Sequence, residues 1–294
     1  MVLVAGSTGY LGSEICRQLR EKGVDVRALV RKSSNPERLS QLKDWGCELV
    51  FGDLKDPQSL KAACDGAETV ISTVTSMVSR QEGDDVVSVD QDGQINLVHA
   101  AADAGAGQFI LIAFPDSRNH PHALNDAKRT VEKAMERSGM AYTSIMANNF
   151  METWLSPVVG FDYPSGKVVI FGEANNPVAF VSLGDVAQLA VACVGHPQAK
   201  NKYIPFGGPD NLSYRQVVEI FEGIDGRAYE VTAVPSDGLK YQLAQATNPI
   251  ESIYTSLMLA SADGIPMDCA EIYATFDIRP TSVADFARRA LGKS

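Results

Sequence analysis

The chain has 294 residues, of which 45% are hydrophobic, and a formal net charge of −10. This length suits one large domain, or a nucleotide-binding domain with a smaller companion. The acidic charge argues against nucleic acid as a direct ligand, because such a ligand requires a basic footprint. No segment approaches the roughly 18 to 20 apolar residues that span a bilayer, and no basic leader precedes the first strand. We therefore expect a cytoplasmic protein without a membrane partner, either a monomer or a homodimer.

The five cysteines are an odd number and include no Cys-x-x-Cys pair, so buried free thiols are expected. No group of histidines and acids has the spacing of metal ligands, and no metal is indicated.

The first twelve residues have the pattern of a phosphate-binding turn. A short apolar strand at 2–4 leads into Gly-x-x-Gly-x-x-Gly, and a helix with apolar residues at helical spacing follows. Such glycines allow a tight turn, close approach of a pyrophosphate and close packing of helix on sheet, with helix N–H groups facing the phosphates. The alternative is a glycine-rich turn of a purely structural α/β unit. The candidate cofactor residues here are Gly6, Ser7, Thr8, Gly9, Tyr10, Leu11 and Gly12.

The second strand, 24–30, ends in Arg31 and Lys32. An acid at this place would bind a ribose 2′-hydroxyl, whereas basic residues suit a 2′-phosphate. No acid occurs between Leu29 and Pro36, so NADP(H) is favoured over NAD(H). The alternative is that both cations are merely solvated.

Strands and helices then alternate. The expected helices are 36–45, one starting near 57, 90–105 and 124–138, and the expected strands are 47–51, 67–74, 108–113 and 142–146. This alternation predicts an α/β fold, a doubly wound parallel sheet of the Rossmann type. We expect residues 1–150 to form the NADP(H)-binding domain with a return segment near 180–206. Residues 151–294 would form a smaller α/β substrate-binding region, with strands at 167–171 and 202–206 and helices capped by Ser182 and Ser213.

Ligands of open α/β sheets bind at the carboxyl ends of the strands. Asp53 and Leu54 follow the third strand and are expected to border the adenine, although Asp53 could instead cap the next helix. A long loop to about Ser88 follows the fourth strand. Its beginning supplies candidate ribose or nicotinamide contacts, Ser72, Thr73, Val74 and Thr75, and the end of the fifth strand adds Ala113 and Phe114.

Lys128 is the candidate catalytic residue. It lies four residues after Leu124 and three before Val131, so it shares the apolar side of a helix whose Arg129 and Glu132 are expected to face mostly outward. A buried lysine requires a partner or a function. It could orient the cofactor and stabilise negative charge that develops on hydride addition. The alternatives are a lysine that extends to solvent or one paired with Glu132.

Several of these motifs together resemble a known family, the atypical short-chain dehydrogenase/reductases of the NmrA-like and isoflavone reductase-like group. The resemblance covers roughly residues 1–225. It rests on the glycine turn, Arg31, Gly52-Asp53, Asp92-Gly-x-x-Asn96, Lys128-x-x-Val-Glu132 with the Ser-Gly-Met-Ala-Tyr-Thr that follows it, Asn148-Asn-Phe-Met-Glu152 and Phe180-Val-Ser-Leu-Gly-Asp185.

The resemblance implies that Asn148, Asn149 and Phe150 line the nicotinamide and substrate cleft and that Lys128 is catalytic. The Tyr-x-x-x-Lys pair of many short-chain reductases is absent, because Leu124 stands in place of the tyrosine and Ala113-Phe114 replaces the usual serine. This departure fits isoflavone reductase-like enzymes with a lone lysine. It fits equally the NmrA-like proteins that bind NADP(H) as sensors.

We therefore expect an NADPH-dependent reductase of a small apolar carbonyl, quinone or conjugated alkene. Phe114, Met151 and Trp154 are expected to form the substrate wall because they are apolar and follow strand ends. His120 and His122 lie in the loop after the fifth strand and could donate a proton, although loop histidines commonly have no catalytic role. The alternative function is a non-catalytic sensor that signals through a protein partner.

Overall fold

The structure is a computed structural model that describes residues 1–79, 81–117 and 119–293. The chain forms two compact units. The first unit contains Met1–Ala113, Ala123–Met146 and Val186–Ile204, and the second contains Phe114–His122, Ala147–Asp185 and Pro205–Ser294.

The first unit is built on a sheet in which the described residues form seven strands in the order β3-β2-β1-β4-β5-β6-β9. Strands β1 to β6 pair in parallel, with Val4 opposite Ala28 on one side and Ile71 on the other. The predicted doubly wound sheet is confirmed, because the order reverses at β1 and β4. The strands are β1 (Val2–Ala5), β2 (Val26–Val30), β3 (Glu48–Phe51), β4 (Thr69–Ser72), β5 (Gln108–Ala113), β6 (Ala141–Ala147) and β9 (Lys202–Phe206).

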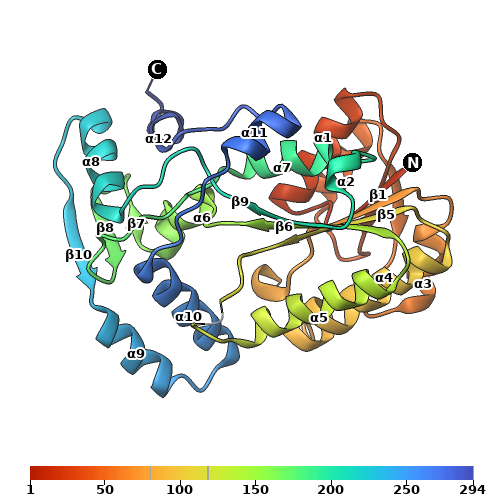
Figure 1. Ribbon diagram of the computed structural model, residues 1–294, viewed down its shortest axis with the longest axis horizontal. Helices are drawn as coiled ribbons and strands as arrows, with labels where there is room; N and C mark the ends of the chain where they lie inside the picture. Colours follow the sequence, from red (N-terminus) through yellow and green to blue (C-terminus); the bar gives the residue numbers. More distant parts are fainter. Residues whose placement is uncertain (80, 118, 294) are drawn as a thin grey trace. The chain divides into compact units, whose positions relative to one another are not determined.

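Helices cover both faces of this sheet. Figure 1 shows α1, α2 and α7 on one face and α3, α4 and α5 on the other. The helices are α1 (Tyr10–Glu21), α2 (Pro36–Asp44), α3 (Pro57–Cys64), α4 (Gln94–Asp103), α5 (Ala123–Arg137) and α7 (Leu183–Ala192), with short turns η1 (Ser76–Val78), η2 (Val86–Gly93) and η4 (Pro197–Ala199). Asn35 and Asp56 accept backbone hydrogen bonds at the starts of α2 and α3, and a proline follows each.

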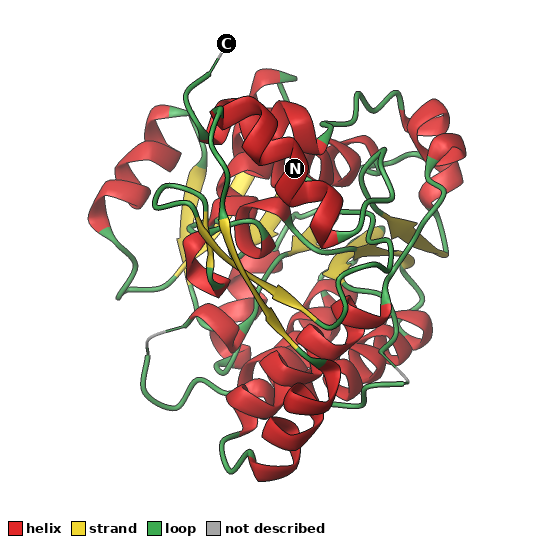
Figure 2. Cartoon of the chain, turned by 90° about the vertical axis from the view of Figure 1, so that its left-hand side faces the viewer, coloured by secondary structure: helices red, strands yellow, loops and turns green. Residues whose placement is uncertain are grey.

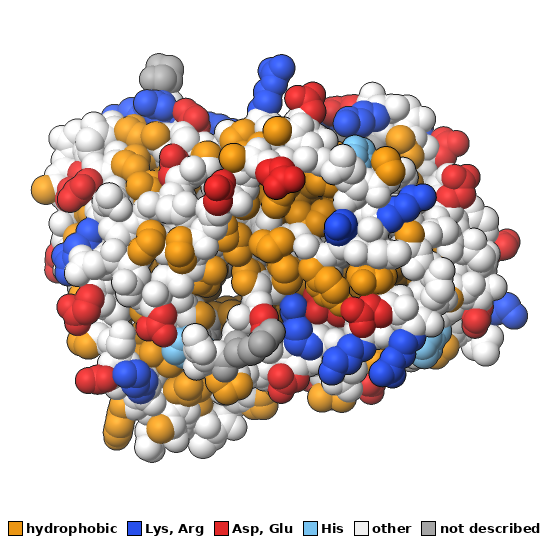
Figure 3. All heavy atoms as spheres, viewed as in Figure 1, with side chains coloured by type: hydrophobic (Ala, Val, Ile, Leu, Met, Phe, Trp, Pro, Cys, Tyr) orange, Lys and Arg blue, Asp and Glu red, His pale blue; other side chains and the backbone are white. Residues whose placement is uncertain are grey.

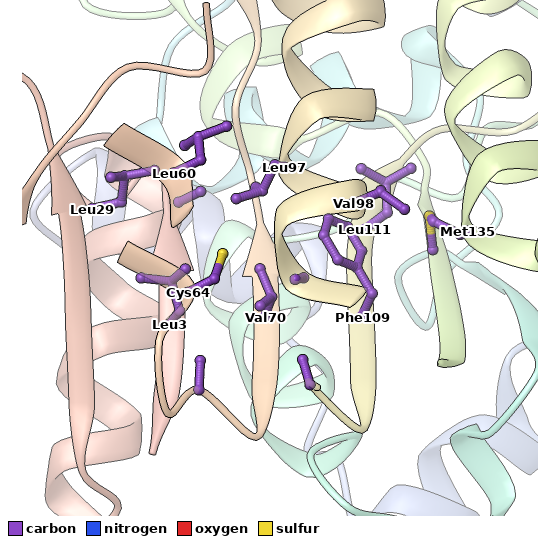
Figure 4. Packing of buried hydrophobic residues seen from close by; sticks show 14 of the residues in the cluster. Leu3, Leu29, Leu60, Cys64, Val70, Leu97, Val98, Phe109, Leu111 and Met135 are labelled. Carbon is purple, nitrogen blue, oxygen red and sulfur yellow. The ribbon is translucent and has the colours of Figure 1, made fainter. Parts of the chain in front are cut away.

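The hydrophobic core of the first unit lies between the sheet and α3, α4 and α5. Leu3, Val70 and Phe109 point from three adjacent strands toward Leu60 and Leu97 of the helices (Figure 4). All five side chains are fully buried. This packing fixes the carboxyl ends of β1, β4 and β5 relative to one another.

The region after β4 differs from the prediction. The strand ends at Ser72, two residues earlier than expected, and the expected helix 90–105 is replaced by a π-helix, η2, followed by α4. Asp85 caps η2 in a reciprocal arrangement with Ser88. A cap at Asp85 starts helical structure before Asp90, and the wider π turn shifts the side chains out of the 3.6-residue period on which the prediction relied.

The second unit has a small sheet in the order β10-β8-β7, with β10 and β8 parallel and β7 and β8 antiparallel. Helices α9 and α10 lie side by side within it (Figure 1). Figure 2 shows the helices and strands of the whole chain in different colours. Its elements are α6 (Met151–Trp154), η3 (Pro157–Val159), β7 (Phe161–Asp162), β8 (Lys167–Phe171), α8 (Tyr214–Asp225), β10 (Glu230–Val234), α9 (Ser236–Gln245), α10 (Pro249–Asp263), α11 (Ala270–Phe276) and α12 (Val283–Ala290).

All five cysteines are free and buried, as predicted. On the face drawn in Figure 3, lysine and arginine side chains are scattered among acidic ones. Within the described ranges, no helix has the length and hydropathy needed to cross a membrane, and no group of three or more potential ligands is placed to hold a metal.

Candidate nucleotide and catalytic site

The glycine turn joins β1 to α1 at the carboxyl edge of the sheet. Gly6 has a φ of +80°, and a Cβ there would lie 2.4 Å from Thr73 Oγ1. A Cβ on Gly12 would lie 2.2 Å from the carbonyl oxygen of Gly6. Both glycines are therefore needed for the turn to pack against the segment after β4 and for α1 to approach the strand.

The N-terminus of α1 fits an anionic ligand. Gly9 caps this helix without any side-chain acceptor, so the first N–H groups are not satisfied by a side chain. The Ser7 hydroxyl is buried and donates to the carbonyl of Leu29 at 2.8 Å, which fixes the turn. Thr8 and Leu11 are half-buried, and Tyr10 is exposed. The backbone of this turn, rather than its side chains, thus provides the cradle that a pyrophosphate requires.

Arg31 and Lys32 follow β2, and the structure adds Lys55 to them. Arg31 Nη1 lies 2.6 Å from Asp84 Oδ2, and Lys55 pairs with the other oxygen of the same carboxylate. Asp84 also accepts from the Ser79 hydroxyl. Burial opposes the charged form of Asp84, but the hydrogen bonds from Lys55, Ser79 and Arg31 outweigh it and lower its pKa to about 2.

This cluster keeps an excess of positive charge at the surface. The Asp84 side chain is 1% exposed, whereas Arg31 and Lys55 remain 36% and 31% exposed. Lys32 is also exposed. Arg31 and Lys55 share one buried carboxylate, and the exposed Lys32 follows Arg31 in the chain, so an excess of positive charge fits a phosphate that would contact the outer donors of these side chains.

Asp53 and Leu54 lie after β3. The Asp53 carboxylate accepts from the backbone N–H of Lys55 at 2.9 Å, and Leu54 is buried with its carbonyl accepting from Asn96 at 3.1 Å. The alternative that Asp53 caps the next helix is wrong, because Asp56 caps α3. Their contact with adenine stays a prediction.

The segment after β4 is held by internal hydrogen bonds. The Ser72 hydroxyl is buried and donates to Gln94 Oε1 at 2.8 Å, and the Thr73 hydroxyl donates to the carbonyl of Ala5 at 3.2 Å. Gln94 Nε2 donates to the carbonyl of Val74 at 3.0 Å. Thr75 caps η1. The hydroxyls expected to contact the cofactor therefore serve first to order this edge of the sheet.

Lys128 points inward on α5, as its spacing predicts. Its side chain is only 4% exposed. Nζ lies 3.3 Å from the carbonyl oxygen of Val74 and 3.4 Å from Oδ1 of Asp90, whose side chain is fully buried. Within the part of the chain that the structure describes, Nζ donates one hydrogen bond, to Val74, and its contact with Asp90 is an ion pair without a hydrogen bond. The alternatives of solvent extension and pairing with Glu132 are wrong.

The expectation that Arg129 and Glu132 face outward is wrong. Glu132 is buried, accepts from the Ser144 hydroxyl at 2.6 Å and pairs with Arg129 at 3.0 Å. Helical spacing places Glu132 beside the apolar stripe, and Ser144 of β6 and Arg129 supply the partners that a buried carboxylate needs.

The remaining candidate residues after β5 and β6 are in different environments. Ala113 ends β5 in the first unit, whereas the others belong to the second. Asn148 donates to the carbonyl of Ile265 at 2.7 Å, Asn149 to Ser261 at 2.8 Å, and Phe150 precedes α6. Their contacts with a cofactor stay predictions.

The expected substrate residues also belong to the second unit. Met151 is fully buried in a hydrophobic cluster, and Trp154 packs edge-on against Phe171 at 6.1 Å between ring centroids. Phe114 stacks on His122 at 5.7 Å. His120 Nε2 lies 2.7 Å from Asp263. None of these contacts identifies a substrate, and the substrate wall stays a prediction.

Sequence reasoning missed four residues that organise the site: Lys55, Asp84, Asp90 and Gln94. Asp84 lies in the loop expected after the fourth strand, Asp90 and Gln94 lie in the expected helix 90–105, and Lys55 lies between β3 and α3. The Asp85-x-x-Ser88 capping pattern was the available signal that a helix begins there, inside the expected loop.

Comparison with known proteins identifies the family. The model of the NmrA-like family matches residues 1–285. The chain belongs to the NmrA-like family.

Relatives of this NmrA-like protein include an assembly factor and reductase homologues. It is 27% identical to the photosystem II assembly factor Ycf39 of Synechocystis, over 99% of this chain and 91% of the relative. It is 28% identical to an isoflavone reductase homologue of Zea mays, over 99% and 98% of the two chains. An Escherichia coli NADPH-dependent quinone oxidoreductase, solved with NADPH, shares the fold with a TM-score of 0.79 and 20% identity over 99% of both chains.

Proposed function

We propose that this protein is an NADPH-dependent reductase that acts on a small apolar carbonyl, quinone or conjugated alkene. The single observation that carries the proposal is the buried ammonium group of Lys128 at the carboxyl edge of a dinucleotide-type sheet, which donates to Val74 and has further N–H groups without an acceptor among the described residues. The family match and relatives with reductase names support the same reading.

Binding of NADP(H) is supported by the two charged features of the first unit. The uncapped N-terminus of α1, with Gly9, would hold the pyrophosphate. Arg31, Lys32 and Lys55 would hold the 2′-phosphate, since Asp84 pairs with Arg31 and Lys55 and neutralises only one of their two charges, and Lys32 is exposed. Once bound, NADPH supplies the hydride.

Lys128 would act where negative charge develops. Hydride addition to a carbonyl, quinone or conjugated enone places charge on the substrate oxygen, and a fixed ammonium N–H stabilises that charge in a site poor in water. A second role is to orient the nicotinamide ribose. The usual tyrosine and serine hydroxyls are absent, so the ammonium group is the proposed electrophile.

A second candidate function is a non-catalytic NADP(H)-binding regulator. Two observations favour it: the missing hydroxyl acid, and similarity to a relative named as a photosystem II assembly factor. Such a protein would bind NADP(H) without consuming it.

The experiment that tests these proposals measures NADPH oxidation against quinones, enals and aromatic ketones, with a direct NADPH titration. Wild type and Lys128→Met are compared. The reductase predicts substrate-dependent oxidation that falls at least about 100-fold in the variant while NADPH binding changes little. Tight NADPH binding without oxidation of any compound would favour the regulator, and absence of binding would contradict both functions.

A further inference from the structure

Asp90 is a buried carboxylate that no proposed binding or catalytic step uses. It lies on η2 with no exposed surface. Oδ2 accepts hydrogen bonds from the backbone N–H and the hydroxyl of Ser76, at 2.8 and 2.6 Å. Oδ1 accepts no hydrogen bond from any described residue, and its charged neighbour is Lys128 Nζ at 3.4 Å.

We propose that Asp90 is the positioning residue of Lys128. It holds the ammonium group in place beside the carbonyl of Val74, so that the N–H groups without a protein partner are presented to the reacting atoms. The inference deepens the proposed reductase function and rests on it, because it concerns the residue assigned to the reacting centre.

The contacts of Nζ define this position. One N–H donates to the carbonyl of Val74, whereas Asp90, whose Oδ1 accepts no hydrogen bond, attracts the ammonium group as a whole by its charge. Gln94 also binds the Val74 carbonyl and therefore fixes that acceptor. One anchored hydrogen-bond acceptor and one fixed charge hold the ammonium group in place, and its other two N–H groups have no acceptor among the described residues.

Burial makes the attraction strong. A carboxylate and an ammonium group removed from water interact more strongly than at the surface, and each is costly to leave without the other. Asp90 cannot move to solvent, because its other oxygen is held by Ser76 on the segment after β4. One side chain thus ties this segment, η2 and α5 together.

The π-helix presents this side chain. Asp90 and Gln94 both project toward the segment after β4, Asp90 to Ser76 and Gln94 to Ser72 and Val74. Gly93 between them is needed for close approach, because a Cβ there would lie 2.9 Å from Leu54 Cβ. A π segment at such a place is typical of a functional site.

The test compares Asp90→Asn with Asp92→Asn. Asparagine at 90 still accepts from Ser76 but lacks the charge that attracts Lys128, whereas Asp92 is exposed and follows Asp90 by two residues. For a substrate that the wild type reduces, we expect Asp90→Asn to lower kcat about 10- to 100-fold and to change the Kd of NADPH less than about threefold. Asp92→Asn is expected to change neither. A kcat within twofold of wild type in Asp90→Asn would overturn the inference.

A double-mutant cycle separates positioning from a general structural effect. If Asp90 acts through Lys128, Asp90→Asn adds less than about twofold to the loss already caused by Lys128→Met. Multiplication of the two losses would overturn the inference. If Asp90→Asn does not fold alone, recovery of the melting temperature in the double variant supports the pairing, and lack of recovery contradicts it.

A spectroscopic measurement decides on Asp90 independently of turnover. The side-chain ¹⁵Nζ signal of Lys128, assigned by its absence in Lys128→Met, is recorded in ¹⁵N-lysine-labelled protein. We expect it to shift or exchange faster with water in Asp90→Asn but not in Asp92→Asn. An unchanged signal in Asp90→Asn would overturn the inference. If no compound is reduced, the proposed function fails by that result, while this comparison still decides whether Asp90 positions Lys128.

Discussion

The first unit contains two clusters in which a buried carboxylate pairs with a lysine. The two carboxylates, Asp84 and Asp90, are six residues apart in sequence, but their clusters differ in net charge and in exposure to solvent. Around Asp84, the cations Arg31 and Lys55 are about one third exposed. Around Asp90, a single cation, Lys128, is 4% exposed. The first cluster can attract an external anion, because positive charge remains in contact with water. The second cluster is nearly neutral. It positions the ammonium group of Lys128 rather than attracting an external anion.

The largest expected effect comes from removing the Asp90 carboxylate. Asp90→Ala leaves the Lys128 ammonium buried without its counter-ion, so we expect the free energy of unfolding to fall by about 3–5 kcal/mol. Urea unfolding at pH 7 measures this change. Asp92→Ala removes an exposed carboxylate of the same segment and is expected to cost less than about 0.5 kcal/mol. A loss below about 1 kcal/mol in Asp90→Ala would show that Lys128 does not depend on this carboxylate.

The Asp84 cluster makes a prediction about cofactor selectivity. Arg31→Gln removes charged donors from the expected 2′-phosphate site, which corresponds to about 1.5–3 kcal/mol of binding free energy, or a roughly 10- to 150-fold weaker Kd for NADPH. The Kd of NADH should change less than about twofold, because NADH has no 2′-phosphate. Isothermal titration calorimetry with both nucleotides measures the difference.

Lys43→Gln is the matched control for Arg31→Gln, since it removes an exposed cation from α2. It tests whether loss of any nearby positive charge weakens NADPH binding. Equal weakening in both variants, or unchanged NADPH affinity in Arg31→Gln, would contradict the assignment of Arg31 to the 2′-phosphate.

The same contrast explains what the sequence could predict. The glycine turn, strand β5 and the inward direction of Lys128 follow from local spacing, and the structure confirms them. The partners of these residues were not predictable, because Arg31 and Asp84 are 53 residues apart and pair through tertiary folding. Asp90 was assigned to the start of an ordinary helix, and the 3.6-residue period gave no indication of a π turn.

The buried position of Glu132 also could not be predicted from the sequence. Helical spacing predicts that a charged residue beside an apolar stripe is exposed. Its burial depends on Ser144, which lies on a neighbouring strand and is not recognisable as a partner from helix spacing. The burial and the partners of the charged residues in the candidate site therefore depend on contacts between elements, whereas the fold could be predicted from periodicity within elements.

The smallest expected effect concerns the pH dependence of the Asp84 cluster. The folded-state pKa of Asp84, about 2, is below its ordinary value of 3.8. The charged carboxylate therefore stabilises the folded state above pH 4, and this contribution is lost as the pH falls from about 4 to about 2. The shift corresponds to about 2 kcal/mol. Urea unfolding of wild type and Asp84→Asn should show a stability difference that decreases by about this amount between pH 6 and pH 2.

The control for this titration is Glu82→Gln, which removes an exposed carboxylate from the same loop. Its unfolding free energy should stay within about 0.5 kcal/mol of wild type throughout. A difference between wild type and Asp84→Asn that is independent of pH would mean that the effect comes from altered packing rather than from the charge. Asp84 would then not be the anion that holds Arg31 and Lys55, and the contrast between the two clusters would rest on exposure alone.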